Sequence, residues 1–206
     1  MADEKSVLLP EVFKGLDDGC ELSVLDLGNA EETSVDFFSQ FKCKVKFLNI
    51  LGSELVKEQN TLEYESLTSR LEEQIGTKPE SFDLCFLWDL PNYLNDLALT
   101  ALGKILEHKI TSSTKIHAIC GYSGRKPLPR KIYSIKDYDY ISAREVNHRL
   151  IPEFVRTHST MTKYLPFLQV AKNTLRPDGR LELLLRSRNI HLESDHRLSY
   201  LINSGT

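Results

Sequence analysis

The most informative segment of this 206-residue chain is Ser23-Val-Leu-Asp-Leu-Gly-Asn-Ala-Glu-Glu-Thr33. Its first half is a short apolar run with one aspartate, and Gly28 ends it, which is typical of a buried strand followed by a tight turn. Its second half is polar and carries adjacent carboxylates at Glu31 and Glu32. The segment therefore predicts a strand and turn that begin a larger sheet.

Outside this segment, strand-like apolar runs alternate with segments of helical spacing. The clearest strand is Phe82–Trp88, where apolar residues are nearly continuous, as in a strand covered on both faces. A helix is expected to begin at Asn95 or Asp96. Further strands are expected at 44–50, 62–67 (a weak one) and 115–120, and helices at 10–16, 33–41 and 67–75. This alternation predicts an α/β fold on a mostly parallel sheet.

The C-terminal third follows a different pattern. Segment 123–136 is basic and contains two prolines, so we expect a loop there, then a short edge strand at 138–141 and a helix at 160–165. Segments 167–175 and 180–186 resemble strands, and Arg176-Pro-Asp-Gly179 between them predicts a hairpin turn. The expected organisation is a lead-in over 1–20, one domain over 21–188 and a polar tail over 189–206.

Composition excludes several classes of function. Hydrophobic residues make up 41% and charged residues 27%, and the net charge of -3 gives no general attraction to nucleic acid or anionic membranes. No apolar segment approaches the roughly 18 residues of a membrane span, and the first residues do not resemble a signal peptide. Cysteines and histidines lack metal-ligand spacing. We therefore expect a cytoplasmic protein with no membrane association and no metal site.

Three features together resemble the class I S-adenosylmethionine-dependent methyltransferases. They are the Leu25-Asp-Leu-Gly28 strand end, the Phe82-Asp-Leu start of a central strand and the terminal hairpin, and the resemblance covers roughly residues 20–187. It implies a Rossmann-like, mostly parallel sheet of seven strands, with helices on both faces and a C-terminal antiparallel hairpin. It also implies S-adenosylmethionine as the cofactor, bound over the carboxyl ends of the first strands.

The resemblance also assigns cofactor-binding positions. They are Asp26, Gly28, Asn29 and Ala30 in the first loop, Asn49 after the second strand and Trp88 at the end of the fourth. In the family this loop runs Asp-x-Gly-x-Gly-x-Gly, and its glycines let backbone N–H groups approach the methionine part of the cofactor.

This chain departs from the family pattern in the first loop and after the second strand. Only Gly28 remains of the glycines, with Ala30 and Glu32 at the other two positions. Glu31 and Glu32 would repel the cofactor's carboxylate unless they point to solvent. Asn49 replaces an acidic residue that accepts both ribose hydroxyls. The sequence therefore leaves cofactor binding open.

Trp88-Asp-Leu-Pro-Asn-Tyr93 is the most distinctive peptide of the chain. It is similar to the Asp/Asn-Pro-Pro-Tyr motif of adenine and glutamine amino-methyltransferases, although the spacing differs. The resemblance implies catalytic roles for Asp89, as hydrogen-bond acceptor or base, and for Tyr93, as a stacking platform. The same residues also suit a turn that only caps the following helix.

The segment Gly124–Lys131, which follows the expected strand at 115–120, carries four cations in eight residues. Its cations are Arg125, Lys126, Arg130 and Lys131, and Tyr122 and Tyr133 flank it. Such a segment suits a phosphate, an acidic partner or RNA, with the tyrosines stacking on bases. A solvated loop without a partner would have the same composition.

Two main hypotheses for function follow. The first is an S-adenosylmethionine-dependent methyltransferase of unknown acceptor, with cofactor binding that is intact, weakened or lost. The second is a non-catalytic methyltransferase-like domain that binds a protein or RNA partner. The path of the chain after Gly28 separates them, because an open pocket above that glycine is needed for methyl transfer.

Overall fold

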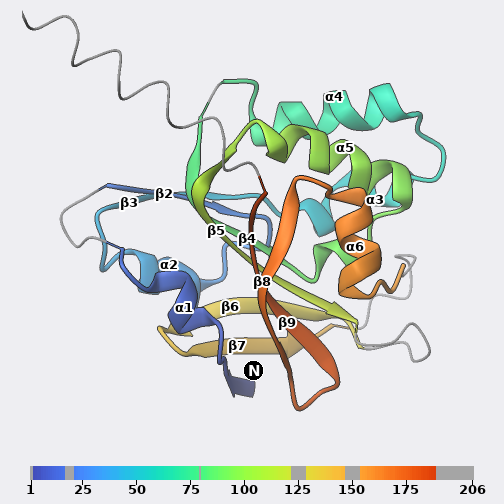
Figure 1. Ribbon diagram of the computed structural model, residues 1–206. Helices are drawn as coiled ribbons and strands as arrows, with labels where there is room; N and C mark the ends of the chain where they lie inside the picture. Colours follow the sequence, from blue (N-terminus) through green and yellow to red (C-terminus); the bar gives the residue numbers. More distant parts are fainter. Residues whose placement is uncertain (1, 17–20, 79, 122–128, 147–153, 189–206) are drawn as a thin grey trace, which may run out of the picture.

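The computed structural model describes residues 2–16, 21–78, 80–121, 129–146 and 154–188. The strands of the main sheet are β2 (Leu22–Asp26), β3 (Cys43–Phe47), β4 (Phe82–Trp88), β5 (Ile110–Gly121), β8 (Leu168–Leu175) and β9 (Arg180–Ser187). Their order in space is β3-β2-β4-β5-β9-β8 (Figure 1). The first four of these pair in parallel, whereas β9 pairs antiparallel with both β5 and β8.

Both faces of this sheet are buried. On β4, Cys85 and Leu87 belong to one apolar core, and Leu84, Phe86 and Trp88 belong to the other. The first core packs against α3 (Glu54–Glu58), α4 (Tyr64–Ile75), α5 (Asp96–Glu107) and α6 (His158–Tyr164). The second packs against α1 (Leu9–Phe13) and α2 (Glu32–Phe38) (Figure 1). No helix of the described residues is long and apolar enough to cross a membrane.

A second, antiparallel sheet lies on the same face as α1 and α2. Its strands are β1 (Ala2–Lys5), β7 (Tyr140–Glu145) and β6 (Lys131–Asp137), in that spatial order. Tyr133, Ile135, Ile141 and Ala143 alternate along β6 and β7 and join the core that contains Phe86. The second sheet is thus packed onto the main one through its apolar face.

Two expectations for this region are wrong. The sequence predicts a loop over 123–136, whereas β6 begins at Lys131, and residues 122–128 lie outside the described part. The edge strand predicted at 138–141 is β7, which begins at Tyr140 and lies in the middle of its sheet. The cations and prolines before β6 favoured the prediction of a loop over its alternating pattern. Strand β7 lies in the middle of its sheet because the N-terminal strand β1 pairs with its other side.

In the part of the chain that the structure describes, the main sheet has six strands and not the predicted seven. The weak strand predicted at 62–67 does not form, because the helical spacing of Leu67, Leu71 and Ile75 extends upstream to Tyr64. All three apolar side chains are buried against the core under α5. The helix includes Thr68, whose hydroxyl donates to the carbonyl of Tyr64 at 2.8 Å. Strand β3 therefore forms one edge of the sheet.

Other predicted elements are confirmed. Strand β4 has the bounds expected from its apolar run. Helix α5 begins after Asn95, whose Oδ1 accepts from the backbone N–H of Ala98 at 2.8 Å, an N-terminal cap. Strands β8 and β9 form the terminal hairpin. Its turn contains Gly179 at φ 82°, a backbone conformation that favours glycine.

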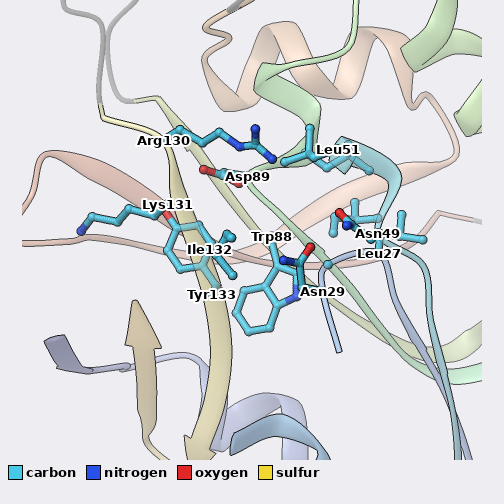
Figure 2. Close-up of a pocket in the computed structure, with 13 residues that line it drawn as sticks. Leu27, Asn29, Asn49, Leu51, Trp88, Asp89, Arg130, Lys131, Ile132 and Tyr133 are labelled. Carbon is cyan, nitrogen blue, oxygen red and sulfur yellow. The ribbon is translucent and has the colours of Figure 1, made fainter. Parts of the chain in front are cut away.

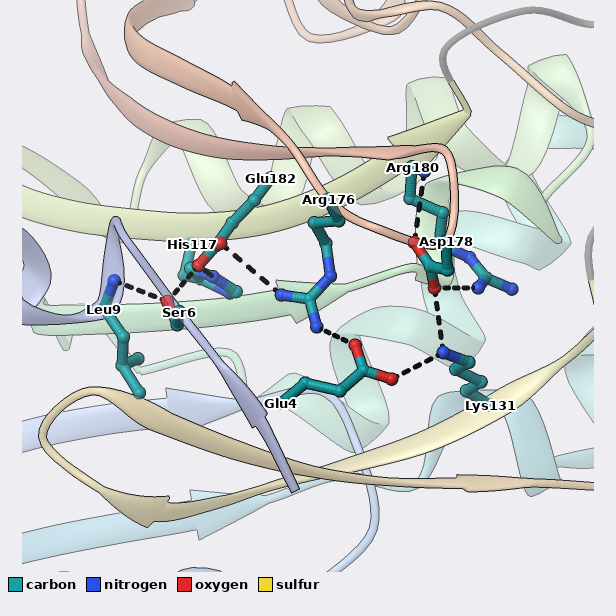
Figure 3. A network of polar contacts seen from close by, with 9 residues as sticks. All are labelled: Glu4, Ser6, Leu9, His117, Lys131, Arg176, Asp178, Arg180 and Glu182. Atoms are coloured by element: carbon teal, nitrogen blue, oxygen red, sulfur yellow. Dashed lines mark hydrogen bonds and ion pairs between the residues drawn. The ribbon is translucent and has the colours of Figure 1, made fainter. Parts of the chain in front are cut away.

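A buried network of charges joins the second sheet to this hairpin (Figure 3). Glu4 of β1 accepts hydrogen bonds from Lys131, at 2.7 Å, and from Arg176. Lys131 also donates to Asp178 at 2.8 Å, and Arg176 donates to Glu182 at 3.4 Å. Three separate parts of the chain therefore meet in one set of ion pairs.

The carboxylates at the two ends of the network have further partners. Glu182 accepts from the hydroxyl of Ser6, and its Oε1 lies 2.9 Å from Nε2 of His117. Asp178 accepts from Arg180 at 2.5 Å. Burial alone would raise the pKa of Asp178, but its hydrogen bonds lower the pKa to about 2. The network is therefore charged at neutral pH.

We predict that Arg176→Met destabilises the protein far more than Lys136→Met. Arg176 is 4% exposed, and its loss removes the arginine from both Glu4 and the buried Glu182, and breaking a buried ion pair in this way costs about 3–5 kcal/mol. Lys136 pairs with Asp3 at the surface, where solvent screens the charges and the pair contributes little to stability. Urea denaturation of both variants measures the difference. Equal, small losses would contradict a structural role for the network.

Candidate functional site

The path of the chain across the main sheet reverses at β2. From β2 the chain passes to β3 on one side, and it later enters β4 on the other side of β2. Open α/β sheets bind ligands at such a reversal, at the carboxyl ends of the strands, because the loops there diverge. Gly28 follows β2 and Asp89 follows β4, so these two positions define the candidate site.

The indole of Trp88 lies in this crevice (Figure 2). It stacks on Tyr133 of β6, with ring centroids 5.6 Å apart and planes within 6°, and on Phe86, at 5.5 Å and 25°. Trp88 has φ 50°, a left-handed conformation that costs a bulky residue roughly 1–3 kcal/mol. The stacking contacts with Tyr133 and Phe86 help to offset this cost.

Asp26 binds the same indole. Its Oδ1 accepts from Nε1–H of Trp88 at 2.7 Å and from the backbone N–H of Gly28 at 2.8 Å. Oδ2 is buried and has no hydrogen-bond partner. A Cβ at position 28 would lie 2.8 Å from Cδ1 of Trp88, so glycine is required there by the ring itself. The retained Gly28 therefore accommodates a side chain of the protein.

The remaining cavity has a volume of about 20 Å³. This is room for about one or two water molecules, whereas small-molecule pockets usually enclose about 300–1,000 Å³. Its walls are Leu27, Gly28, Asn29, Asn49, Leu51, Leu87, Trp88, Asp89, Leu90, Arg130, Lys131, Ile132 and Tyr133 (Figure 2). A nucleoside cofactor does not fit into this conformation.

Asp89 and Tyr93, the residues predicted to be catalytic, lie next to each other. The hydroxyl of Tyr93 is 3.5 Å from Oδ2 of Asp89, and both residues are buried. Burial raises the pKa of Asp89 to about 7, although Arg180 and Arg130 act in the opposite direction. A carboxyl with this pKa exchanges its proton near neutral pH, as a general acid or base must. The 20 Å³ cavity, however, has no room for a substrate beside it.

The other predicted cofactor-binding residues have different surroundings. Asn49 lines the cavity and also caps the short helix η1 (Ile50–Gly52), whose last N–H donates to its Oδ1 at 3.0 Å. Asn29 lines the cavity and donates to Glu31 at 3.3 Å. Glu31 pairs with Arg144 of β7, also at 3.3 Å, and so does not fill the crevice. Ala30 is exposed and outside the cavity wall.

Strand β6 contributes side chains to this site that were not predicted from the sequence. Of the four cations in the basic segment, Arg125 and Lys126 lie outside the described residues, and Arg130 and Lys131 are buried and line the cavity. Tyr133 forms part of the wall by stacking on Trp88. The alternation of apolar and polar residues after Lys131 is the signal that predicts these inward side chains. Within the described ranges, no group of three or more His, Cys, Asp or Glu side chains is placed to hold a metal ion.

Comparison with known proteins identifies the fold. No protein-family profile and no curated protein sequence matches the chain. Solved structures match despite low identity. The PH0226 protein from Pyrococcus horikoshii OT3 matches at TM-score 0.52 and 12% identity, over 88% of each chain. The glycopeptide N-methyltransferase MtfA matches at TM-score 0.50 and 12% identity, over 89% of this chain and 96% of that one.

The pyocyanin biosynthetic protein PhzM matches at TM-score 0.48 and 15% identity, over 88% of this chain and 54% of that one, so the chain spans about half of its length. The fold is that of the class I S-adenosylmethionine-dependent methyltransferases, as the resemblance in the sequence predicted. A likeness at this level of identity defines the architecture and leaves the activity to be argued from the site.

We predict that stability falls as pH rises from about 5 to 8. Burial raises the pKa of Asp26 to about 7, despite the hydrogen bonds from Gly28 and Trp88, and burial raises that of Asp89 to about 7. The native state therefore keeps protons that the unfolded chain loses near pH 4, which costs on the order of 4 kcal/mol per group once both states are ionised.

Asp26→Asn should remove the part of this pH-dependent loss of stability that comes from Asp26. Asp36 is exposed, so Asp36→Asn should leave the loss of stability with pH unchanged. Urea denaturation at pH 5 and pH 8 measures both variants. The assignment fails if Asp26→Asn shows the same loss of stability with pH as the wild-type protein.

Gly28→Ala is predicted to lower the free energy of unfolding by about 1–3 kcal/mol, the usual cost of overpacking. The added methyl group would clash with Trp88, which is fixed between two rings. In a Trp88→Leu background the same substitution should cost less, and a double-mutant cycle measures this coupling. Additive effects would mean that the two residues do not meet as described.

Proposed function

We propose that this chain is a non-catalytic methyltransferase-like domain that acts by binding a partner. The observation that carries the proposal is the position of the Trp88 indole. It occupies the crevice at the strand reversal, with Asp26 bonded to its Nε1 and Tyr133 stacked on its face. The cavity beside it, about 20 Å³, is too small for a nucleoside.

The changes in the first loop support the same proposal. Family loops use glycines to let a ligand approach the backbone, and here the glycine at position 28 accommodates an indole of the same chain. Glu31, at a position that would face an anionic ligand group, is engaged by Arg144. Methyl transfer needs little from side chains beyond positioning of the reactants, so loss of the pocket removes the main requirement for catalysis.

A second candidate function is a methyltransferase whose crevice opens. One observation favours it: Trp88 is held at φ 50°, and backbone strain of this kind often marks conformational change at functional sites. In that case the closed state competes with the cofactor, and the apparent affinity is reduced by the fraction of open molecules. Removing the indole would then increase affinity.

For the wild-type protein we predict no stabilisation by 1 mM S-adenosylmethionine or S-adenosylhomocysteine. A dissociation constant of about 10 μM would add roughly 2.7 kcal/mol at that concentration, which thermal denaturation detects easily. Calorimetric titration of the same ligands provides an independent measurement. Saturable binding by the wild-type protein would overturn the proposal.

Trp88→Ala distinguishes the two candidates. If the crevice opens for a cofactor, this variant should bind S-adenosylmethionine more tightly than the wild-type protein does. A non-catalytic domain should gain no binding, because the altered loop offers no other contacts. The variant must first be shown to fold by circular dichroism, and Trp88→Phe, which keeps an aromatic ring in the stack, serves as the matched control.

A further inference from the structure

Arg130 is a buried cation that has no counter-ion among the described residues. The residue is 9% exposed, and its Nε has no hydrogen-bond partner. Among the described residues, no carboxylate oxygen lies within the 4.0 Å of an ion pair with it. Its guanidinium carbon lies 5.9 Å from the centre of the Tyr93 ring, a cation–π contact that does not neutralise the charge.

The other buried arginines of the described chain are all paired. Arg156 contacts Asp96 at 2.6 Å, Arg180 contacts Asp178 at 2.5 Å, and Arg176 contacts Glu182 at 3.4 Å. Burying a cation without a partner is unfavourable, because the charge loses its hydration and gains no attraction in return. Arg130 therefore differs from the arginines whose role is to hold the fold together.

Arg130 is directed into the cavity. In Figure 2 its side chain extends over Asp89, and the guanidinium points toward Leu51. Asp89 lies nearby without forming an ion pair, and burial raises its pKa to about 7, so up to neutral pH it does not supply a full negative charge. Nothing in the described wall of the cavity satisfies the guanidinium.

We propose that Arg130 binds a single carboxylate, carried on an apolar stem, at the mouth of this cavity. The planar fork of a guanidinium matches the two oxygens of a carboxylate. A cavity of about 20 Å³ admits a group of that size and little more. Leu51 and Leu90 in the wall suit an apolar stem. The site lies in the same cavity as the candidate cofactor crevice, but a simple carboxylic acid probes it without a nucleoside.

The surroundings disfavour multiply charged ligands. The chain has a net charge of -3, and Asp89 gains negative charge above pH 7. Lys131, the neighbouring cation, is already paired with Glu4 and Asp178. Among the described residues of the wall, one cation is therefore free. A phosphate dianion or an RNA backbone carries more negative charge than this cation neutralises, whereas a single carboxylate is matched by it.

Trp88 provides the readout for a direct test, because it is the only tryptophan of the chain and lines the same cavity. Butyrate, titrated at pH 6.5 and constant ionic strength, should give a saturable change in tryptophan emission. Arg130→Gln should abolish the change, and Arg130→Lys should weaken binding roughly tenfold or more, because lysine lacks the fork. Arg186→Gln, which removes an exposed arginine of β9, should bind butyrate as the wild-type protein does.

Further ligands identify the source of the carboxylate and test the alternatives. Tighter binding of the peptide Ala-Ala-Glu-Ala-Ala than of butyrate indicates a protein side chain, and the reverse order indicates a small carboxylic acid; both orders support the site. The proposal is overturned if wild-type emission does not saturate, if folded Arg130→Gln responds equally, or if inorganic phosphate or a ten-nucleotide RNA binds more tightly. Butyrate contains no nucleoside, so these results are separate from those with S-adenosylmethionine.

Discussion

The hydrogen bond from the indole of Trp88 to the carboxyl group of Asp26 is the contact on which the site depends. It joins the end of β4 to the end of β2, the two strands at which the chain reverses across the sheet. Trp88, which donates this hydrogen bond, has a left-handed backbone conformation, and its ring lies parallel to that of Tyr133. One carboxyl oxygen takes both donors and the other takes none, so Asp26 is well oriented but poorly solvated.

The second sheet both contributes side chains to this site and covers it. Strand β6 contributes Tyr133 to the aromatic stack, and the ion pairs of Lys131 join the same strand to β1 and to the terminal hairpin. Open α/β sheets generally bind ligands at such a strand reversal, but here the indole of Trp88 fills this position and belongs to the hydrophobic core. The proposed binding of a ligand therefore rests on groups at the rim of the cavity, and the buried Arg130, whose Nε has no hydrogen-bond partner, is one of them.

The sequence predicted well the elements whose signals are local. The continuous apolar run of β4, the cap at Asn95 and the turn at Gly179 each depend on neighbouring residues, and all three are found in the structure. The resemblance to a methyltransferase fold was correct, but the prediction of a seventh strand was wrong. The strand was expected at 62–67, where helix α4 forms because the helical spacing from Leu67 onward outweighs the short apolar run.

The site was less predictable because its contacts are distant in sequence. Trp88 was expected to touch a cofactor, and no local pattern reveals that it stacks on a side chain from β6, 45 residues later in the chain. Glu31 was expected to repel the cofactor's carboxylate unless it pointed to solvent, and its pairing with Arg144 was not foreseen, because Arg144 lies in a strand that the sequence misplaced. Long-range pairing of this kind follows from the packing of two sheets, which residue spacing alone does not encode.

The missing seventh strand has a consequence for how molecules of this protein meet one another. Among the described strands β3 pairs with β2 alone and so forms an edge of the main sheet, a geometry that invites edge-to-edge aggregation. Lys44 and Lys46 alternate within its five residues, and such charges disfavour the approach of an identical strand from a neighbouring molecule. The short, cationic border thus protects a truncated sheet against self-association.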